Sequence, residues 1–172
     1  MTKGFNLLCR TMLVTLTALV LISPLMACAQ PEKADLVVVH KADRVLELWS
    51  NGETLAKYHV ALGFNPIGRK QFEGDGRTPE GVYTISQRNE SSHYYRSLKI
   101  NYPNDLDLQD AAARGQPPGG MIMIHGLPNH KSASQVGHPT RDWTDGCIAV
   151  SNNEMQKIWD DVPTGTAVLI MP

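Results

Sequence analysis

The chain has 172 residues, with 16 basic and 17 acidic side chains, so its formal net charge at neutral pH is −1. The basic residues are dispersed and form no stripe with interleaved aromatic residues, which argues against a nucleic-acid partner. About 144 residues follow the N-terminal leader described next, which is enough for one domain with its own core.

Residues 1–29 are predicted to be a signal peptide. Lys3 and Arg10 give this segment a basic start, residues 11–25 are almost all apolar, and Ser23-Pro24 interrupts the run. A membrane-spanning helix needs roughly 20 apolar residues, so a retained anchor is less favoured. Removal of the leader leaves 14 basic and 17 acidic residues, a net charge near −3. We therefore expect an exported, periplasmic protein.

Two cleavage chemistries fit the end of this leader. Ala27-Cys28-Ala29 is a small-x-small site that would make Gln30 the first mature residue. The run Leu25-Met26-Ala27-Cys28 also looks like a lipobox, in which Cys28 would be lipidated and would tether the protein to the outer membrane. The sequence leaves both open.

The mature part predicts a mainly β fold. Three strands are expected at 36–39, 45–49 and 55–61, with Asn51-Gly52 as a hairpin turn between the last two. Further strands fit 81–86, 94–100 and 120–125, and the apolar residues of 120–125 do not alternate, which predicts burial on both faces.

One or two short helices complete the expected fold. Ser151 and Glu154 match a capping box, and an apolar face follows it at Met155, Ile158, Trp159 and Val162. A second short helix is expected near 107–113, ended by Gly115.

Two long irregular segments, 63–81 and 125–147, separate the strands. Loops of this length are uncommon in compact domains and are often functional, so we expect them to form the wall of a cleft. The alternative is that both are ordinary solvated excursions.

Cys147 is the candidate nucleophile. Cys9 and Cys28 fall in or at the leader, so Cys147 has no obvious disulfide partner, and an unpaired exported thiol suggests catalysis, unless it is a small buried thiol. His125, at the end of an apolar run, is the preferred general base, because a residue on a strand holds its geometry better than a loop residue. His138 is the rival base.

The segments His125-Gly126 and Thr144-Asp145-Gly146-Cys147-Ile148 resemble the signature of the L,D-transpeptidases, the YkuD-type catalytic domain. The resemblance runs from about Asp35 to the C-terminus, so residues 35–172 are expected to form this catalytic domain, with a β-sandwich or barrel-like fold and a closing strand near 165–170. Two positions depart from the family pattern. Asp145 stands where a histidine is usual, and Ala149 where an arginine is frequent.

The resemblance implies a cysteine-dependent acyl transfer on peptidoglycan stem peptides, without a cofactor. Cys147 would attack the carbonyl of the L-centre of diaminopimelate, and the terminal D-alanine would leave. With water as the acceptor the same site would be a carboxypeptidase or amidase. The two departures also motivate a third reading, a non-catalytic module that binds the cell wall.

Residues near Cys147 in sequence, together with His125 and Gly126, are expected to assist the reaction. An imidazole nearby is expected to lower the pKa of Cys147 by favouring an ion pair. The N–H groups of Cys147 and Gly146 are candidate oxyanion donors, and Gly126 would allow close backbone approach to His125. Thr144 could orient the histidine or the loop.

Substrate contacts are expected from charged residues of the two loops. Asp145 could bond loop amides or face the amine of the acceptor, while Arg141 or Arg77 could bind the substrate carboxylate. A zinc site is disfavoured, because His125, His130, His138, Asp142 and Cys147 lack the close ligand pairs of zinc proteins.

Overall fold

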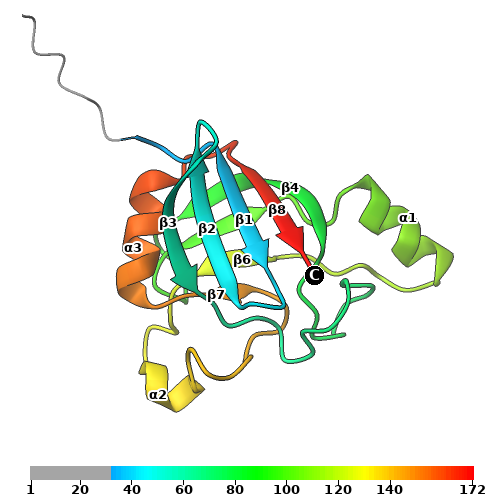
Figure 1. The fold of residues 1–172 in the computed structure, drawn as a ribbon. Helices are drawn as coiled ribbons and strands as arrows, with labels where there is room; N and C mark the ends of the chain where they lie inside the picture. The colour runs from blue at the N-terminus through cyan, green and yellow to red at the C-terminus, as the bar shows by residue number, and fades with distance from the viewer. Residues whose placement is uncertain (1–31) are drawn as a thin grey trace, which may run out of the picture. The chain divides into compact units, whose positions relative to one another are not determined.

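The computed structural model describes residues 32–172, so the predicted signal peptide with Cys9 and Cys28 lies outside the described residues. The eight strands follow one another side by side in the order β3-β2-β1-β8-β4-β5-β6-β7 (Figure 1). Their bounds are β1 Leu36–His40, β2 Val45–Ser50, β3 Glu53–His59, β4 Gly81–Asn89, β5 Ser97–Ile100, β6 Met123–His125, β7 Ile148–Ala149 and β8 Ala167–Met171.

The sheet is mixed and curls until its ends meet. Most neighbours are antiparallel, but β1 pairs with β8 and β6 pairs with β7 in parallel. Beyond the end of β3, Ala61 exchanges two backbone hydrogen bonds with Ala149 of β7, at 2.9 and 2.8 Å. This contact joins the two ends of the strand order, which confirms the mainly β, barrel-like prediction.

The predicted strands are confirmed, with shifts at their ends. The turn at Asn51-Gly52 has φ values of 52° and 83°, as a type I′ hairpin requires. Predicted strand 94–100 is shorter in the structure, and 120–125 reduces to β6 at Met123–His125. The predicted burial of 120–125 on both faces is wrong, because Met121 is 61% exposed and lies before the strand.

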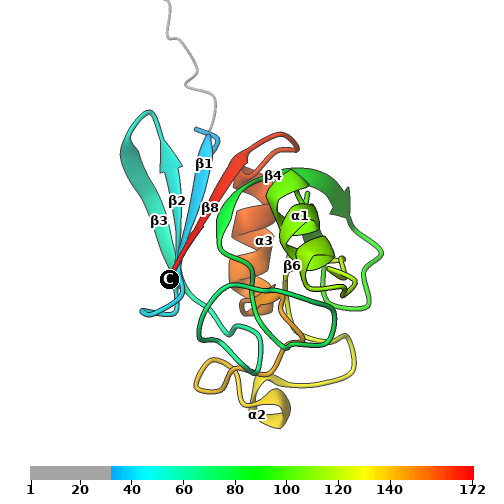
Figure 2. The same ribbon diagram turned by 90° about the vertical axis from the view of Figure 1, so that its right-hand side faces the viewer.

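Residues 32–172 contain three helices, which lie around the sheet (Figures 1 and 2). Helix α3, Asn152–Asp161, begins with the predicted capping box of Ser151 and Glu154, and helix α1, Asp105–Ala113, covers the second predicted segment. Helix α2, Ala133–Val136, is a single turn that the sequence analysis did not predict. It lies in the long loop after β6.

The core fills the inside of the curled sheet and is closed by α3. The predicted apolar face of α3 is confirmed, since Met155, Ile158 and Val162 are fully buried and Trp159 packs against the same cluster. Within residues 32–172, no helix is long and apolar enough to cross a membrane.

Candidate active site

The pairing of β6 with β7 brings the two predicted catalytic residues together. His125 is the last residue of β6 and lies opposite Ala149, while Cys147 directly precedes β7, level with Met123. Side chains two positions apart on a strand share one face. His125 and Cys147 therefore project from the same face of neighbouring chain segments.

Both side chains line one cavity of about 270 Å³. Its other walls come from the β4–β5 connection and from the segment before β6, and its lining residues are Asn89, Ser92, His93, Tyr94, Met121, Met123, His125 and Cys147. The Cys147 thiol lies 3.5 Å from the carbonyl oxygen of Met121. His93 belongs to this wall, although no sequence pattern predicted that it lies near the thiol.

The ring of His125 is held by the next residue. Its Nδ1 lies 2.6 Å from the carbonyl oxygen of Gly126. A carbonyl only accepts hydrogen bonds, so Nδ1 carries the proton and the neutral ring keeps a free lone pair on Nε2. Gly126 must be glycine here, because a Cβ would lie 2.7 Å from Oδ1 of Asn152 and 2.8 Å from the carbonyl oxygen of Tyr95.

Two aromatic rings enclose the imidazole. The ring centroid of Tyr94 lies 4.3 Å from that of His125, and Trp143 approaches edge-on with its centroid at 5.8 Å. His125 is consequently only 2% exposed. Tyr94 and Trp143 were not predicted as site residues, because neither carries a chemical signature and their contact with His125 exists only in the fold.

The protonation states differ from the sequence-based expectation. Burial lowers the pKa of His125 to about 4, an effect that the Gly126 hydrogen bond opposes and His138 adds to. Burial also raises the pKa of the Cys147 thiol, and the charge of Asp145 raises it further. The expected thiolate–imidazolium pair is therefore wrong for the resting site, because desolvation disfavours both charged forms. Both pKa shifts favour the neutral thiol and the neutral imidazole.

His138, the rival base, occupies a different place. It is half-buried and does not line the cavity that holds the thiol. Its Nδ1 is buried without a hydrogen-bond partner in residues 32–172, and burial lowers the pKa of the ring. The geometry favours His125 as the base.

Thr144 organises the loop that carries the thiol. Its hydroxyl donates to the carbonyl oxygen of Cys147 at 2.7 Å and accepts from the N–H of Gly146 at 3.2 Å. The predicted oxyanion role of Gly146 needs correction, because its N–H is already engaged. The N–H of Gly126 is also directed elsewhere, to the carbonyl oxygen of Tyr95 at 3.2 Å. Of the predicted donors, the Cys147 N–H remains the candidate.

The 63–81 loop contacts residues 142–147, the thiol loop, from the other side. It lines the cavity beside Asp145 but not the cavity of Cys147, so the predicted cleft wall around the cysteine is correct only in part. The N–H of Phe64 donates to the carbonyl oxygen of Thr144 at 2.8 Å. Gly146 has φ of +130° and lies so close to Arg77 that a Cβ would stand 2.6 Å from the Arg77 carbonyl oxygen. Glycine is therefore required at 146 both by its backbone conformation and by its contact with this loop.

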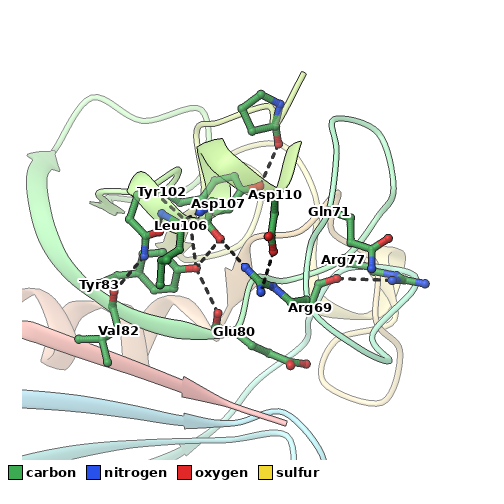
Figure 3. A network of polar contacts seen from close by, with 12 residues as sticks. Arg69, Gln71, Arg77, Glu80, Val82, Tyr83, Tyr102, Leu106, Asp107 and Asp110 are labelled. Atoms are coloured by element: carbon green, nitrogen blue, oxygen red, sulfur yellow. Dashed lines mark hydrogen bonds and ion pairs between the residues drawn. The ribbon is translucent and has the colours of Figure 1, made fainter. Parts of the chain in front are cut away.

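A polar network fixes the same loop to α1 (Figure 3). Asp107 of α1 accepts a hydrogen bond from the Tyr83 hydroxyl at 3.0 Å and pairs with Arg69 at 3.4 Å. Arg69 pairs also with Asp110 at 2.8 Å, and its carbonyl oxygen accepts from the Arg77 guanidinium at 3.4 Å. The predicted anchor Arg77 thus uses its side chain within the loop.

Of the other predicted substrate contacts, Asp145 lines a cavity and Arg141 does not. Arg141 is exposed and its side chain packs beside Gly137. Neither Arg141 nor Arg77 lines the cavity of Cys147 or a second cavity that lies beside Asp145. Asp145 is exposed and does line that second cavity. Between residues 32 and 172, no three His, Cys, Asp or Glu side chains group closely enough to hold a metal ion.

This arrangement can be compared with known proteins. The model of the L,D-transpeptidase catalytic domain, YkuD, matches residues 34–170. The chain belongs to this family. The match spans β1 to β7 completely and β8 as far as Ile170, and it includes both His125 and Cys147.

Curated relatives carry the same family name. The chain is 30% identical over 143 residues to a protein of Escherichia coli strain K12 named as the L,D-transpeptidase YafK, a match that covers 79% of the chain and 50% of YafK. It is 27% identical over 138 residues to the protein named as L,D-transpeptidase YqjB of Bacillus subtilis strain 168, which covers 78% of the chain and 69% of YqjB. The chain thus spans about half the length of YafK.

A solved structure agrees with this assignment. The helical cell shape determining protein Pgp2 from Campylobacter jejuni superposes with a TM-score of 0.62 at 27% identity, covering 78% of this chain and 46% of Pgp2. The shared region covers less than half of Pgp2.

Proposed function

We propose that the protein is a cysteine-dependent acyltransferase that acts on peptidoglycan stem peptides. The observation that carries this proposal is the pair of His125 and Cys147 on one cavity, with Nδ1 of the imidazole fixed by the Gly126 carbonyl. A module that only binds the cell wall has no need of a thiol beside an oriented base. Membership of the L,D-transpeptidase family supports the same reaction class.

The first half-reaction follows from the neutral resting site. Nε2 of His125 takes the thiol proton as Sγ of Cys147 attacks the carbonyl of the L-centre of diaminopimelate. The C–S bond forms, the carbonyl becomes a tetrahedral oxyanion, and the Cys147 N–H is the proposed donor to it. When the C–N bond breaks, the imidazolium returns the proton to the departing D-alanine amine, leaving a thioester.

The second half-reaction reverses these roles. The amine of an acceptor stem peptide attacks the thioester and His125 takes a proton from that amine. The C–S bond then breaks, and the imidazolium gives this proton to Sγ of Cys147, which restores the neutral thiol and the neutral imidazole. The product is a new amide between two peptides. Water can use the same route and would yield a tripeptide, so the choice of acceptor decides between cross-linking and hydrolysis.

Product analysis tests this function. The purified mature protein is incubated with disaccharide-tetrapeptides, and the products are separated and weighed. We expect a dimer joined between two diaminopimelate residues, the 3-3 cross-link, together with free D-alanine. A tripeptide as the sole product would make the protein a hydrolase, and unchanged substrate with tight binding would make it a cell-wall binding module.

We also propose that the enzyme works outside the cytoplasm, in the periplasm, after removal of the leader at residues 1–29. A wall substrate requires export, and Pgp2, which is named for its role in helical cell shape, supports a contribution to wall architecture and cell shape. The intact mass of the native mature protein tests this location. A start at Gln30 without lipid supports soluble export, a Cys28 start with acyl mass supports a membrane tether, and an uncleaved leader contradicts the proposal.

A further inference from the structure

A second cavity of about 280 Å³ lies beside the thiol loop, on the side of Asp145. Its lining includes Lys70, Glu73, Ile122 and Asp145. The cavity of Cys147 is lined by Met121 and Met123. Since Ile122 lines the second cavity while Met121 and Met123 line that of Cys147, residues 121–123 form a wall shared by both cavities.

The most unusual group of the second cavity is a buried ammonium. The Lys70 side chain is 3% exposed and its Nζ donates to Asp75 at 2.8 Å and to the carbonyl oxygen of Phe72 at 3.1 Å. An ammonium has three N–H groups, so one N–H of Lys70 has no acceptor among residues 32–172. Burying a cation is costly unless it is fully paired, and a third, anionic partner would complete this one.

Backbone hydrogen bonds fix the position of the ion pair between Lys70 and Asp75. Asp75 also accepts hydrogen bonds from the backbone N–H groups of Gln71 and Arg77, at 2.7 and 3.0 Å. Burial raises the pKa of Asp75, but these hydrogen bonds and Lys70 outweigh it and lower the pKa overall. Asp75 therefore stays ionised and holds Lys70 at the cavity wall.

The other charges of the cavity are negative. Asp145 and Glu73 are both exposed, and neither carboxylate accepts a hydrogen bond from any residue between 32 and 172. One cavity thus presents a buried donor for an anion and two free acceptors for a cation. An α-amino acid group, with a carboxylate and an ammonium on one carbon, has matching charges.

We propose that the cavity lined by Lys70, Glu73 and Asp145 binds the zwitterionic α-amino-carboxylate group of a substrate, with Lys70 on its carboxylate and Asp145 and Glu73 on its ammonium. The inference rests on the proposed function, in which the free end of a diaminopimelate side chain is such a group. That end can belong to the acylated donor, or to an acceptor whose ammonium first gives one proton to Asp145 or Glu73, so that the resulting amine has a lone pair with which to attack the thioester.

Pairs of substrates that differ by one carboxylate test the role of Lys70. In the donor arm, kcat/KM for D-alanine release is compared between a diaminopimelate tetrapeptide and its lysine analogue, which lacks the side-chain carboxylate. In the acceptor arm, transfer to D-methionine is compared with transfer to 3-(methylthio)propylamine. We expect the native protein to prefer the carboxylate substrate about 10- to 100-fold in one arm, the range of a charge-assisted hydrogen bond.

Lys70→Gln should reduce this preference to less than about threefold, while Lys41→Gln should keep it. Lys41 is a matched control, because it is also a buried lysine paired with a carboxylate, Glu80 at 2.7 Å, but lines neither cavity beside Cys147. If the preference is lost in the donor arm, the cavity binds the donor substrate, and if it is lost in the acceptor arm, the cavity binds the acceptor. An equal preference in native and Lys70→Gln protein, or no preference in either arm, overturns the inference.

A second variant keeps the test independent of Lys70. The double variant Asp145→Asn, Glu73→Gln changes two exposed positions, so the fold should be retained. The native protein should prefer substrates with a free side-chain amine over substrates in which this amine is acetylated, and the double variant should show a weaker preference. Unchanged discrimination contradicts the ammonium half of the proposal. If the native protein turns over no tetrapeptide at all, the proposed function itself fails, which is a distinct result.

Discussion

Arg44 and Asp142, 98 residues apart in sequence, form a two-point ion pair that fixes the start of the thiol loop. The guanidinium donates from Nε to Oδ1 of Asp142 at 3.1 Å and from Nη2 to Oδ2 at 2.7 Å. Asp142 also accepts from the N–H of Leu62 at 2.8 Å. The turn after β1, the chain after β3 and the loop before Cys147 therefore meet at one carboxylate.

Removing Arg44 should therefore affect both stability and rate. We expect Arg44→Ala to lower the free energy of unfolding by about 1–2 kcal/mol, since the pair is partly exposed, and to lower kcat about 10-fold or more through displacement of the loop. Urea unfolding and steady-state kinetics measure the two effects. Glu90→Gln, which breaks the more exposed pair with Arg96, is the control and should change neither. A normal kcat in Arg44→Ala would contradict the positioning role.

The pKa of about 4 for His125 predicts an unusual pH dependence. With the neutral imidazole as the proposed base, kcat/KM should hold well below the ordinary histidine pKa of 6.5 and fall near pH 4. Alkylation of Cys147 should be slower at pH 7 than that of a free cysteine, because burial raises its pKa. An acidic limb at pH 6.5 or a fast-reacting thiol at pH 6 would contradict this account.

The same pKa links His125 to stability. In the unfolded chain the imidazole takes up a proton near pH 6.5, whereas the folded protein resists it until about pH 4. Stability contributed by the neutral ring is thus complete above pH 6.5 and is lost as the pH falls toward 4, in total on the order of 3 kcal/mol. The unfolding free energy of the native protein should therefore fall relative to that of His125→Gln as the pH is lowered from 6.5 to 4. A difference between the two proteins that does not depend on pH would contradict this prediction.

Gly126→Ala tests the close approach behind the histidine. Its Cβ would crowd Asn152 Oδ1 and the Tyr95 carbonyl oxygen, so the strand must shift and the Nδ1 hydrogen bond of His125 with it. We expect a loss of about 1–3 kcal/mol in stability and a larger loss in kcat than in KM. Gly120→Ala, which has open space around its Cβ, should leave stability unchanged. Equal behaviour of the two variants would argue against the packing constraint.

The two histidines can be ranked directly. His125→Ala should be nearly inactive, because it removes the proposed base, which shares the cavity with Cys147. His138→Ala should keep substantial activity, because that ring lies outside the cavity. Turnover of a tetrapeptide by both folded variants gives the ranking, and the reverse order would move the base role to His138.

Local patterns in the sequence were sufficient for most of the fold. The capping box at Ser151, the Asn51-Gly52 hairpin and the apolar face of α3 each depend on neighbours within a few residues, and the structure confirms all three. Helix α2 was missed because a single turn carries too few residues for a periodic pattern.

The candidate site was predicted less completely, because its surroundings are made by distant segments. Tyr94 and Trp143 enclose His125 only after β4, β5 and β6 have paired, and Arg44 has no signal near Asp142 in sequence. The ion-pair expectation failed for the same reason, since the pKa of His125 is set by burial that no local motif reveals. Lys70 was not predicted as a site residue, because no pattern in the neighbouring sequence indicates that its side chain is buried at a cavity.

The central claim is that Cys147 carries the acyl group during turnover, and intact-mass spectrometry tests it most directly. The purified protein is mixed with a diaminopimelate tetrapeptide, quenched in acid within the first turnovers, weighed and digested to locate the adduct. We predict a mass increase equal to the substrate minus D-alanine, attached to Cys147, and no adduct in a folded Cys147→Ser variant that has also lost turnover. Turnover retained by Cys147→Ser, or an adduct on any other residue, would contradict the account.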